Sequence, residues 1–169
     1  MANAKLGRPS KEKMAIMRNQ VSNLLWNGKL ETTEAKAKSA KAMAEKIITL
    51  AIDTYEDSVK VQKTIKDAKG VKVVKEVIND GPKKLAARRK IMSKLYDLQE
   101  IKAEKESKSA YRERTKEIKH PLIEKIFNEY APKYAKRAQE LGTKGGYTRI
   151  SKLGARRGDA AEMALVEMI

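Results

Sequence analysis

Residues 145–169 read GGYTRISKLGARRGDAAEMALVEMI. The stretch contains two runs in which apolar and polar residues alternate, separated by a turn rich in glycine and arginine. We predict strands over 147–153 and 163–169 with a turn over 154–159, because alternation with period two places every second side chain on one face of a sheet. The apolar face of the last strand would comprise Ala164, Val166 and Met168.

Two helices are predicted near the start of the chain. The first begins at Ser10, a candidate N-cap, and stops at Asn27-Gly28. Its apolar residues recur at helical spacing: Met14, Met17, Val21, Leu24 and Leu25. Residues 29–31 form a short link or a strand, and Thr32 or Thr33 caps the second helix. The buried stripe of that helix would be Ala40, Met43, Ala44, Ile47 and Ala51.

The middle of the chain has a weaker pattern. Residues 53–82 mix charged residues with short apolar groups and end at a Gly-Pro break, after which a basic helix is expected. Its apolar contacts would be Leu85, Ile91, Leu95 and Leu98. Residues 102–119 are almost entirely charged or small, which predicts an exposed helix or a flexible insertion, because such a segment buries too little apolar surface to offset ordering.

A compact apolar helix is expected to start at Pro121, and Pro132 is expected to limit its extension. Three glycines at 142, 145 and 146 mark a loop before the final strands. The pattern therefore predicts a single α/β (α+β) domain over 1–169, in which helices pack on a small sheet in two layers, with an irregular basic arm at 1–9.

The charge of the chain points to a polyanionic partner. Lys and Arg number 38 against 22 Asp and Glu, a formal net charge of +16 in 169 residues. Nucleic acid is the usual partner, because each phosphate that Lys or Arg neutralises releases condensed counterions. A membrane surface is disfavoured, because an interfacial helix needs bulky apolar residues and the chain has one Trp and one Phe. The N-terminus is polar and basic, so we expect a cytoplasmic protein without a secretory signal.

The candidate RNA-binding residues lie in the basic arm, the first two helices, the charge run at 88–90 and the C-terminal hairpin. Arginines in the C-terminal hairpin can bind phosphates bidentately, its glycines permit close backbone approach, and Tyr147 offers a stacking face. Three of these segments also have an interpretation without RNA binding: a hairpin whose arginines are only solvated, a disordered tail at 1–9, and a solvated charge run at 88–90. The candidate residues are Lys5, Arg8, Lys11, Arg18, Lys36, Lys38, Lys41, Arg88, Arg89, Tyr147, Arg149, Lys152, Arg156 and Arg157.

Catalytic and cofactor sites are not indicated by the sequence. The chain has no cysteine, and its one histidine, His120, precedes Pro121 and is better explained as a helix-entry residue than as a base or metal ligand. The glycines at 142–146 lack the nucleotide-binding pattern G-x-x-x-x-G-K-[ST]. We therefore expect no enzyme, no cofactor, no metal site and no small-molecule substrate. Trp26 is more typical of core packing than of base stacking.

Short motifs along the chain resemble one family when taken in order. They cover about residues 4–53, 85–96 and 121–169. They are KLGR (5–8), RN (18–19), LL (24–25), ETTEAKAK (31–38), AEKIITLA (44–51), ARR (87–89), IF (126–127), APKY (131–134), GGYTRI (145–150), KLG (152–154), RRGDAA (156–161) and EMA (162–164). The chain resembles the ribosomal protein L17 family of the bacterial large subunit.

The resemblance implies helix, strand, three helices and two strands, with residues 30–32 joining the C-terminal strands in a three-stranded sheet. It implies ribosomal RNA binding and large-subunit assembly, beside neighbouring ribosomal proteins and near the exit of the nascent peptide. The chain departs from the family pattern in longer segments at 54–80 and 98–119, expected to be helical or charged insertions, in Ala155 where proline is common, and in an extended loop at 142–144.

The functional prediction is a structural constituent of the large ribosomal subunit that binds and clamps ribosomal RNA and supports subunit assembly and translation. Positive side chains on the arm, the second helix and the hairpin would hold several RNA segments. The alternative is a free nucleoid or RNA-chaperone protein, which would bind nucleic acid without retention in ribosomes. An RNA-modifying enzyme would need a cofactor pocket and a polar catalytic cluster, and the sequence indicates neither.

Overall fold

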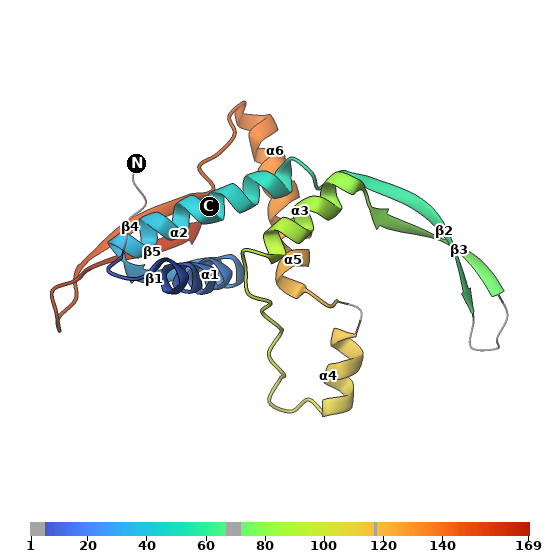
Figure 1. Ribbon diagram of the computed structural model, residues 1–169, viewed down its shortest axis with the longest axis horizontal. Coiled ribbons are helices and arrows are strands. Elements are labelled where there is room, and N and C mark those ends of the chain that lie inside the picture. Colours follow the sequence, from blue (N-terminus) through green and yellow to red (C-terminus); the bar gives the residue numbers. More distant parts are fainter. Residues whose placement is uncertain (1–5, 67–71, 117) are drawn as a thin grey trace.

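Three antiparallel strands form the main sheet of the computed structural model, which describes residues 6–66, 72–116 and 118–169 (Figure 1). The strands are β1 (Lys29–Thr33), β4 (Thr148–Ala155) and β5 (Glu162–Met168). Their order is β1-β5-β4, so the last strand of the chain lies in the centre. The three-stranded sheet and the α+β class are as predicted.

The register of the sheet explains which side chains reach the core. Val166 lies opposite Leu30 on one side and Ile150 on the other, and Ala164 lies opposite Thr32. Ala164, Val166 and Thr32 are buried, so this face meets the helices. Beyond Lys152, strand β4 carries one extra residue before Gly154, whose φ of 91° is a conformation that favours glycine.

Two long helices cover the buried face of the sheet. Helix α1 (Ser10–Asn27) ends at Gly28, which has a φ of 76° and whose N–H donates to the carbonyl of Leu24 at 2.8 Å. Ser10 is the first helical residue instead of the N-cap, because Pro9 occupies the cap position. Helix α2 (Glu34–Ile52) starts directly after Thr33, whose backbone is extended and whose side chain makes no capping bond.

Alanines on α2 allow close packing in the core. Four of the six buried residues of α2 are alanine, and all four have no exposed surface. They are Ala37, Ala40, Ala44 and Ala51. Small side chains let α2 contact α1, the sheet and the C-terminal helices together, at the cost of less apolar area per residue than leucine would bury. Larger residues from neighbouring elements, including Leu24, Ile91 and Tyr134, fill the remaining volume.

A continuous helical segment runs through Pro132. Helix α5 (Pro121–Lys125) leads into a π-helical turn (Ile126–Tyr130) and then into α6 (Ala131–Leu141). The expectation that Pro132 limits the helix is wrong. The N–H of Ala131 donates to the carbonyl of Ile126, five residues back, and this wider turn relieves the conflict between the proline ring and the preceding turn. No helix in the described part of the chain is long and apolar enough to cross a membrane.

The first middle insertion is a β-hairpin, whereas helical or charged segments were expected there. Strands β2 (Ser58–Lys66) and β3 (Lys72–Asp80) pair antiparallel and project from the body (Figure 1). In β2, Val59 and Val61 alternate with polar residues, but in β3 the apolar residues stand in adjacent pairs at 73–74 and 77–78, so the sequence lacks the continuous period of two that identifies a hairpin. Asp57 anchors the base: its carboxylate accepts from the backbone N–H of Lys83 and Lys84, at the start of α3 (Pro82–Met92).

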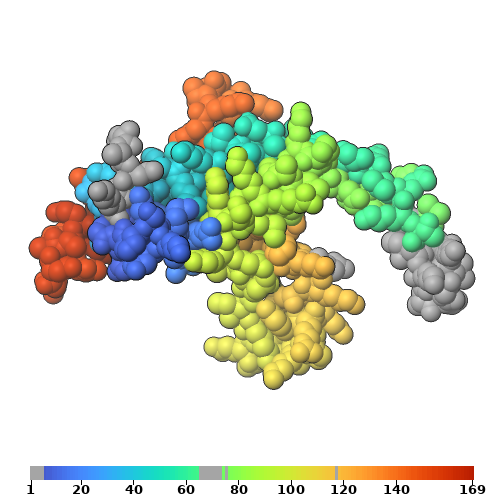
Figure 2. All heavy atoms as spheres, viewed as in Figure 1, coloured from blue at the N-terminus to red at the C-terminus, as the bar shows by residue number. Residues whose placement is uncertain are grey.

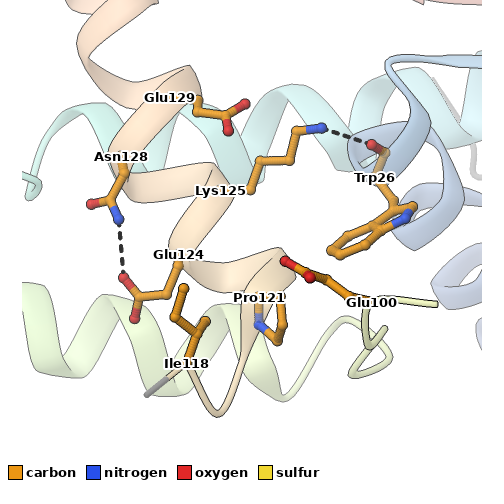
Figure 3. Close-up of a pocket in the computed structure, with 8 residues that line it drawn as sticks. All are labelled: Trp26, Glu100, Ile118, Pro121, Glu124, Lys125, Asn128 and Glu129. Carbon is orange, nitrogen blue, oxygen red and sulfur yellow. Dashed lines mark hydrogen bonds between the residues drawn. The ribbon is translucent and has the colours of Figure 1, made fainter. Parts of the chain in front are cut away.

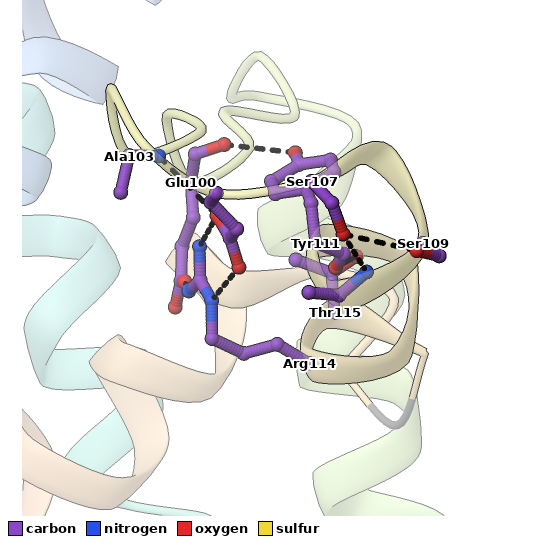
Figure 4. Close-up of polar contacts among 9 residues, drawn as sticks. Glu100, Ala103, Ser107, Ser109, Tyr111, Arg114 and Thr115 are labelled. Atoms are coloured by element: carbon purple, nitrogen blue, oxygen red, sulfur yellow. Dashed lines mark hydrogen bonds and ion pairs between the residues drawn. The ribbon is translucent and has the colours of Figure 1, made fainter.

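The second insertion contains a short exposed helix, as predicted. Helix α4 (Lys108–Thr115) buries none of its residues. It is held to its own approach loop by polar contacts, shown in Figure 4. Arg114 pairs with Glu100 and, at 3.1 Å, with Glu106, and the hydroxyl of Tyr111 donates to the carbonyl of Glu100 at 2.9 Å. The insertion therefore orders itself mainly through contacts within 98–119.

Candidate nucleic-acid interface

One end of the molecule gathers three segments that are distant in sequence. The start of α1, the start of α2 and the tip of the β4–β5 hairpin lie together at the left of Figure 2. All three carry cationic side chains that the sequence singled out. Tertiary structure thus brings the described end of the expected arm, from residue 6, together with the second helix and the hairpin. Lys5 lies outside the described residues.

Glu34 connects two cations of this surface. Its carboxylate contacts the ammonium of Lys38 at 2.9 Å and that of Lys152 at 3.3 Å, which ties the first turn of α2 to strand β4. Hydrogen bonds from Lys38 and Lys152 lower the pKa of Glu34 below its usual value. Two lysines share one carboxylate, so the cluster retains a net positive charge. Both ammonium groups stay exposed to solvent.

Other cations on α1 and α2, and Arg8 just before α1, differ in how fully they are paired. Arg8 pairs with Glu12 at 3.2 Å, and Lys41 lies 3.9 Å from Glu45. Among the described residues, Lys11 and Lys36 have no ion-pair partner. Arg18 is half-buried, and within 6–66, 72–116 and 118–169 its Nε finds no hydrogen-bond partner. A desolvated donor without a partner gains most from an added anion.

The hairpin tip is organised by an internal arginine–carboxylate pair. Arg156 donates to Asp159 through Nε at 2.9 Å and through Nη2 at 2.6 Å. Hydrogen bonding from Arg156, followed by that from the Ala161 N–H, lowers the pKa of Asp159 to about 2. Arg156 therefore shapes the turn as well as adding charge. Its neighbour Arg157 is exposed, and no described residue pairs with it.

Arg149 lies on the face of the sheet that points away from the helices. It is exposed and lies opposite Glu167 in the strand register. Lys29 flanks the same glutamate from the other side, on β1. Glu31 shares this outer face of β1, so the two cations there are balanced by two carboxylates and the net positive charge is concentrated at the hairpin tip and the starts of α1 and α2.

Tyr147 cannot serve as a stacking face, which corrects the prediction. Its side chain is 2% exposed and packs against the ring of Tyr134, with centroids 4.9 Å apart. Arg137 covers both rings and donates to the carbonyls of Gly145 and Gly146 at 2.6 and 3.1 Å. Arg137 therefore holds the glycine loop through hydrogen bonds within the protein. Its place among glycines and arginines in the sequence does not reveal that the Tyr147 side chain is buried.

Arg88 also serves the fold, contrary to the prediction. It pairs with Asp80 at 2.6 Å and with Glu124, and its side chain is 17% exposed. Its guanidinium lies over the ring of Phe127 at 5.2 Å, so it joins the base of the β2–β3 hairpin to the α3–α5 contact. Arg89 is exposed, but it lies on α3, apart from the basic end of the molecule.

The cavity in Figure 3 does not have the composition of an active site or an anion site. It has a volume of about 350 Å³ and is lined in part by Trp26, Glu100, Glu124 and Glu129. Glu124 accepts from Asn128 and pairs with Arg88, and Lys125 donates to the carbonyl of Trp26 at 2.8 Å. In the described residues there is no group of three His, Cys, Asp or Glu placed to hold a metal.

His120 stands at the entry to α5, as predicted. It occupies the residue before Pro121, and its Nδ1 lies 3.1 Å from Asp97. Trp26 is half-buried and packs against the core, which agrees with the packing interpretation. Helix α6 adds cations that were not predicted, among them Lys133 and Lys136, because the helix was expected to end at Pro132, but α6 lies apart from the cationic end of the molecule. The KYAKRA pattern after the proline was the available signal.

Comparison with known proteins gives one consistent match. The family described as Ribosomal protein L17 matches residues 16–169. A protein named large ribosomal subunit protein bL17 from Lachnospira eligens is 41% identical, over 98% of this chain and 97% of its own length. Proteins of the same name from Acetivibrio thermocellus (35% identical, 99% of both chains) and Ruminiclostridium cellulolyticum (37% identical, 98% of this chain and 97% of the relative) are also similar.

Proposed function

This chain belongs to the ribosomal protein L17 family, and from that membership we propose that it clamps ribosomal RNA in the large subunit and supports assembly of that particle. It is a structural component of the bacterial ribosome and not an enzyme. The relatives are named as large-subunit proteins, and their similarity extends over almost the whole of both chains. Ribosomal RNA and neighbouring ribosomal proteins, in cytoplasmic ribosomes, are the partners proposed.

The observation that carries the proposal is the cationic end formed by α1, α2 and the β4–β5 hairpin. Its residues come from 8–41 and 149–157, so this surface forms only when the chain folds. Arg149, Arg157, Lys11 and Lys36 have no strong internal partner among the described residues and are available to phosphates. Arginine binds phosphate oxygens in pairs, and lysine adds a mobile point charge.

The clamp acts by position and charge. Phosphate contacts fix the register of the RNA segments, and selectivity comes from RNA shape and 2′-hydroxyl contacts. The cations are held on ordered elements. The ion pair of Glu34 with Lys152 joins α2 to β4, and the ion pair of Asp159 with Arg156 orders the hairpin tip. With about six to ten phosphates neutralised, affinity for RNA falls by about 10³ to 10⁵ between 50 and 200 mM salt.

The test is retention in the particle. We expect the chain to sediment with large subunits on a sucrose gradient and to remain through a high-salt wash at one copy per subunit. The variant Arg149→Ala with Arg157→Ala should be incorporated less well. The matched control is Arg112→Ala with Lys116→Ala near α4, which removes the same charge from outside the interface. Equal incorporation of both variants would exclude the hairpin, and a free protein absent from subunits would favour a nucleoid or RNA-chaperone role.

A further inference from the structure

A groove of about 270 Å³ lies on the surface between α1 and α2. No residue of the β4–β5 hairpin lines it, and it was not among the predicted sites. Its lining combines methionines with lysines from three segments of the chain. The residues are Lys13, Met14, Met17, Ser39, Ala42, Met43, Lys46 and Lys94.

The apolar floor of the groove consists of three thioethers. Met17 is buried, Met43 is half-buried against the core, and Met14 is 45% exposed. Methionine is flexible and polarizable, and its sulfur makes favourable contacts with aromatic rings. Met14 presents apolar surface to water in a groove that all three methionines line. This floor suits a flat aromatic group better than an aliphatic one.

The groove is surrounded by positive charge. Lys13, Lys46 and Lys94 come from α1, α2 and the segment after α3, and no described carboxylate pairs with any of them. No carboxylate lines the groove. Glu45, next to Lys46 in sequence, instead accepts from Thr148 of β4 and contacts Lys41. An occupant that is aromatic and anionic therefore matches both parts of the groove.

We propose that this groove receives one unpaired nucleobase of ribosomal RNA, with the base on the methionines and the adjoining phosphates on the three lysines. The inference rests on the proposed function. Unpaired bases are what proteins recognise in RNA through stacking and edge contacts, because the major groove of paired RNA is too narrow for side chains. The groove volume is below that of most pockets for drug-sized ligands, so it suits a single ring system. A docked amphipathic helix would instead need room for several apolar side chains along its length.

The test compares RNA hairpins that differ by one unpaired nucleotide. The full chain is titrated with a fully paired hairpin and with four versions that carry a single A, C, G or U bulge in the stem. Wild-type protein should prefer at least one bulged hairpin by about three- to tenfold, the range expected from contacts of this kind. Met14→Ala with Met43→Ala should abolish the preference and leave the affinity for the paired hairpin unchanged.

Two controls separate the groove from general effects. Met92→Ala removes an exposed methionine on α3 and should keep the bulge preference. The variant Lys13→Gln, Lys46→Gln and Lys94→Gln should weaken binding to the bulged hairpin and reduce the slope of log affinity against log salt by about two to three. A 4-thiouridine at the bulge should crosslink wild-type protein within residues 13–17, 39–46 or 94, which needs no variant to fold.

Each remaining outcome overturns the proposal. Equal binding of bulged and paired hairpins, a preference that survives loss of both methionines, or crosslinks confined to other segments would exclude a base in the groove. Binding of an acidic amphipathic peptide, lost in the methionine variant and without any bulge preference, would assign the groove to a protein partner. Failure to bind any hairpin, with no salt-dependent affinity for ribosomal RNA, would instead contradict the proposed function itself.

Discussion

At the scale of single residues, the arginines divide into two groups that sequence does not distinguish. Arg88, Arg114 and Arg156 are held by carboxylates within the protein, whereas Arg149 and Arg157 face solvent. The internal group stiffens the places where elements meet, and the exposed group carries the proposed RNA contacts. A substitution in either group removes one charge. In the internal group it should loosen a contact between elements, and in the exposed group it should weaken the proposed RNA contacts.

The pair between Arg156 and Asp159 predicts a pH response of the hairpin tip. Because the pKa of Asp159 is lowered to about 2 from 3.8, its stabilising contribution is present above pH 3.8 and is lost as the pH falls through about 2. NMR titration should give a midpoint near 2. In Arg156→Ala the midpoint should rise toward 3.8, although the Ala161 N–H still donates to the carboxylate. An unchanged midpoint would contradict the contact.

The hydroxyl of Tyr130 predicts a stability effect in the core. It donates to the carbonyl of Leu25 at 3.0 Å, and Tyr130 is 8% exposed. Tyr130→Phe leaves this buried carbonyl without that partner, so the free energy of unfolding should fall by about 1–3 kcal/mol. Urea denaturation measures the change. Tyr96→Phe, at a ring 42% exposed, is the control and should change the free energy little.

At the scale of elements, the two insertions attach to the core in different ways. The β2–β3 hairpin is built into its surroundings through Asp57 and through the Asp80–Arg88 pair. The α4 segment depends on contacts within itself, and at its boundary the side chain of Gln99 donates to the carbonyl of Lys119 at 3.2 Å. The ends of the α4 insertion therefore lie close together, and removal of the segment leaves a short gap to close.

Deletion of residues 100–117 should leave the fold intact. The segment buries none of α4 and contributes no residue to the main core cluster. We expect a melting temperature within a few degrees of that of the full chain. The helical signal in circular dichroism should match that expected for the helices that remain. An unfolded deletion variant would show that the insertion supports the core. Shorter deletion within the same segment, of α4 alone, distinguishes strain at the junction from loss of contacts.

At the scale of the whole molecule, charge and shape work together. The β2–β3 hairpin, α4 and the β4–β5 tip project from a central body in different directions (Figures 1 and 2). A net charge of +16 on such an extended surface opposes compactness in the free protein and favours contact with a polyanion. In the proposed clamp, the β4–β5 tip is the projection that carries cations toward RNA beyond the reach of the central body.

Salt should act on the free and the bound protein in opposite directions. Between 50 and 200 mM salt, screening of like charges should raise the melting temperature of the free chain. Over the same interval the affinity for ribosomal RNA should fall steeply. Differential scanning fluorimetry and filter binding measure the two effects. A melting temperature that falls with salt would mean that surface ion pairs outweigh repulsion, and a flat affinity would contradict a phosphate-based interface.

Much of the architecture could be predicted because its signals are local. Apolar spacing placed α1, α2 and the two C-terminal strands, and Gly28 ended α1 where expected. The β2–β3 hairpin and the helix beyond Pro132 were missed, since the apolar residues of β3 do not alternate with polar ones and a π turn accommodated the proline. For the interface, sequence identified the cationic segments but assigned Arg88 and Tyr147 to it as well.

By itself, then, the sequence determined the α+β class, the strongly positive charge and the family, because periodicity, composition and motif order are properties of the chain that need no partner in space. Tertiary structure alone decided which cations remain available. Arg88 and Glu124 are 36 residues apart in the chain and meet only after folding, and Tyr147 is buried by Tyr134 of another element. Pairing and burial depend on distances in space, and these follow from packing of the whole chain.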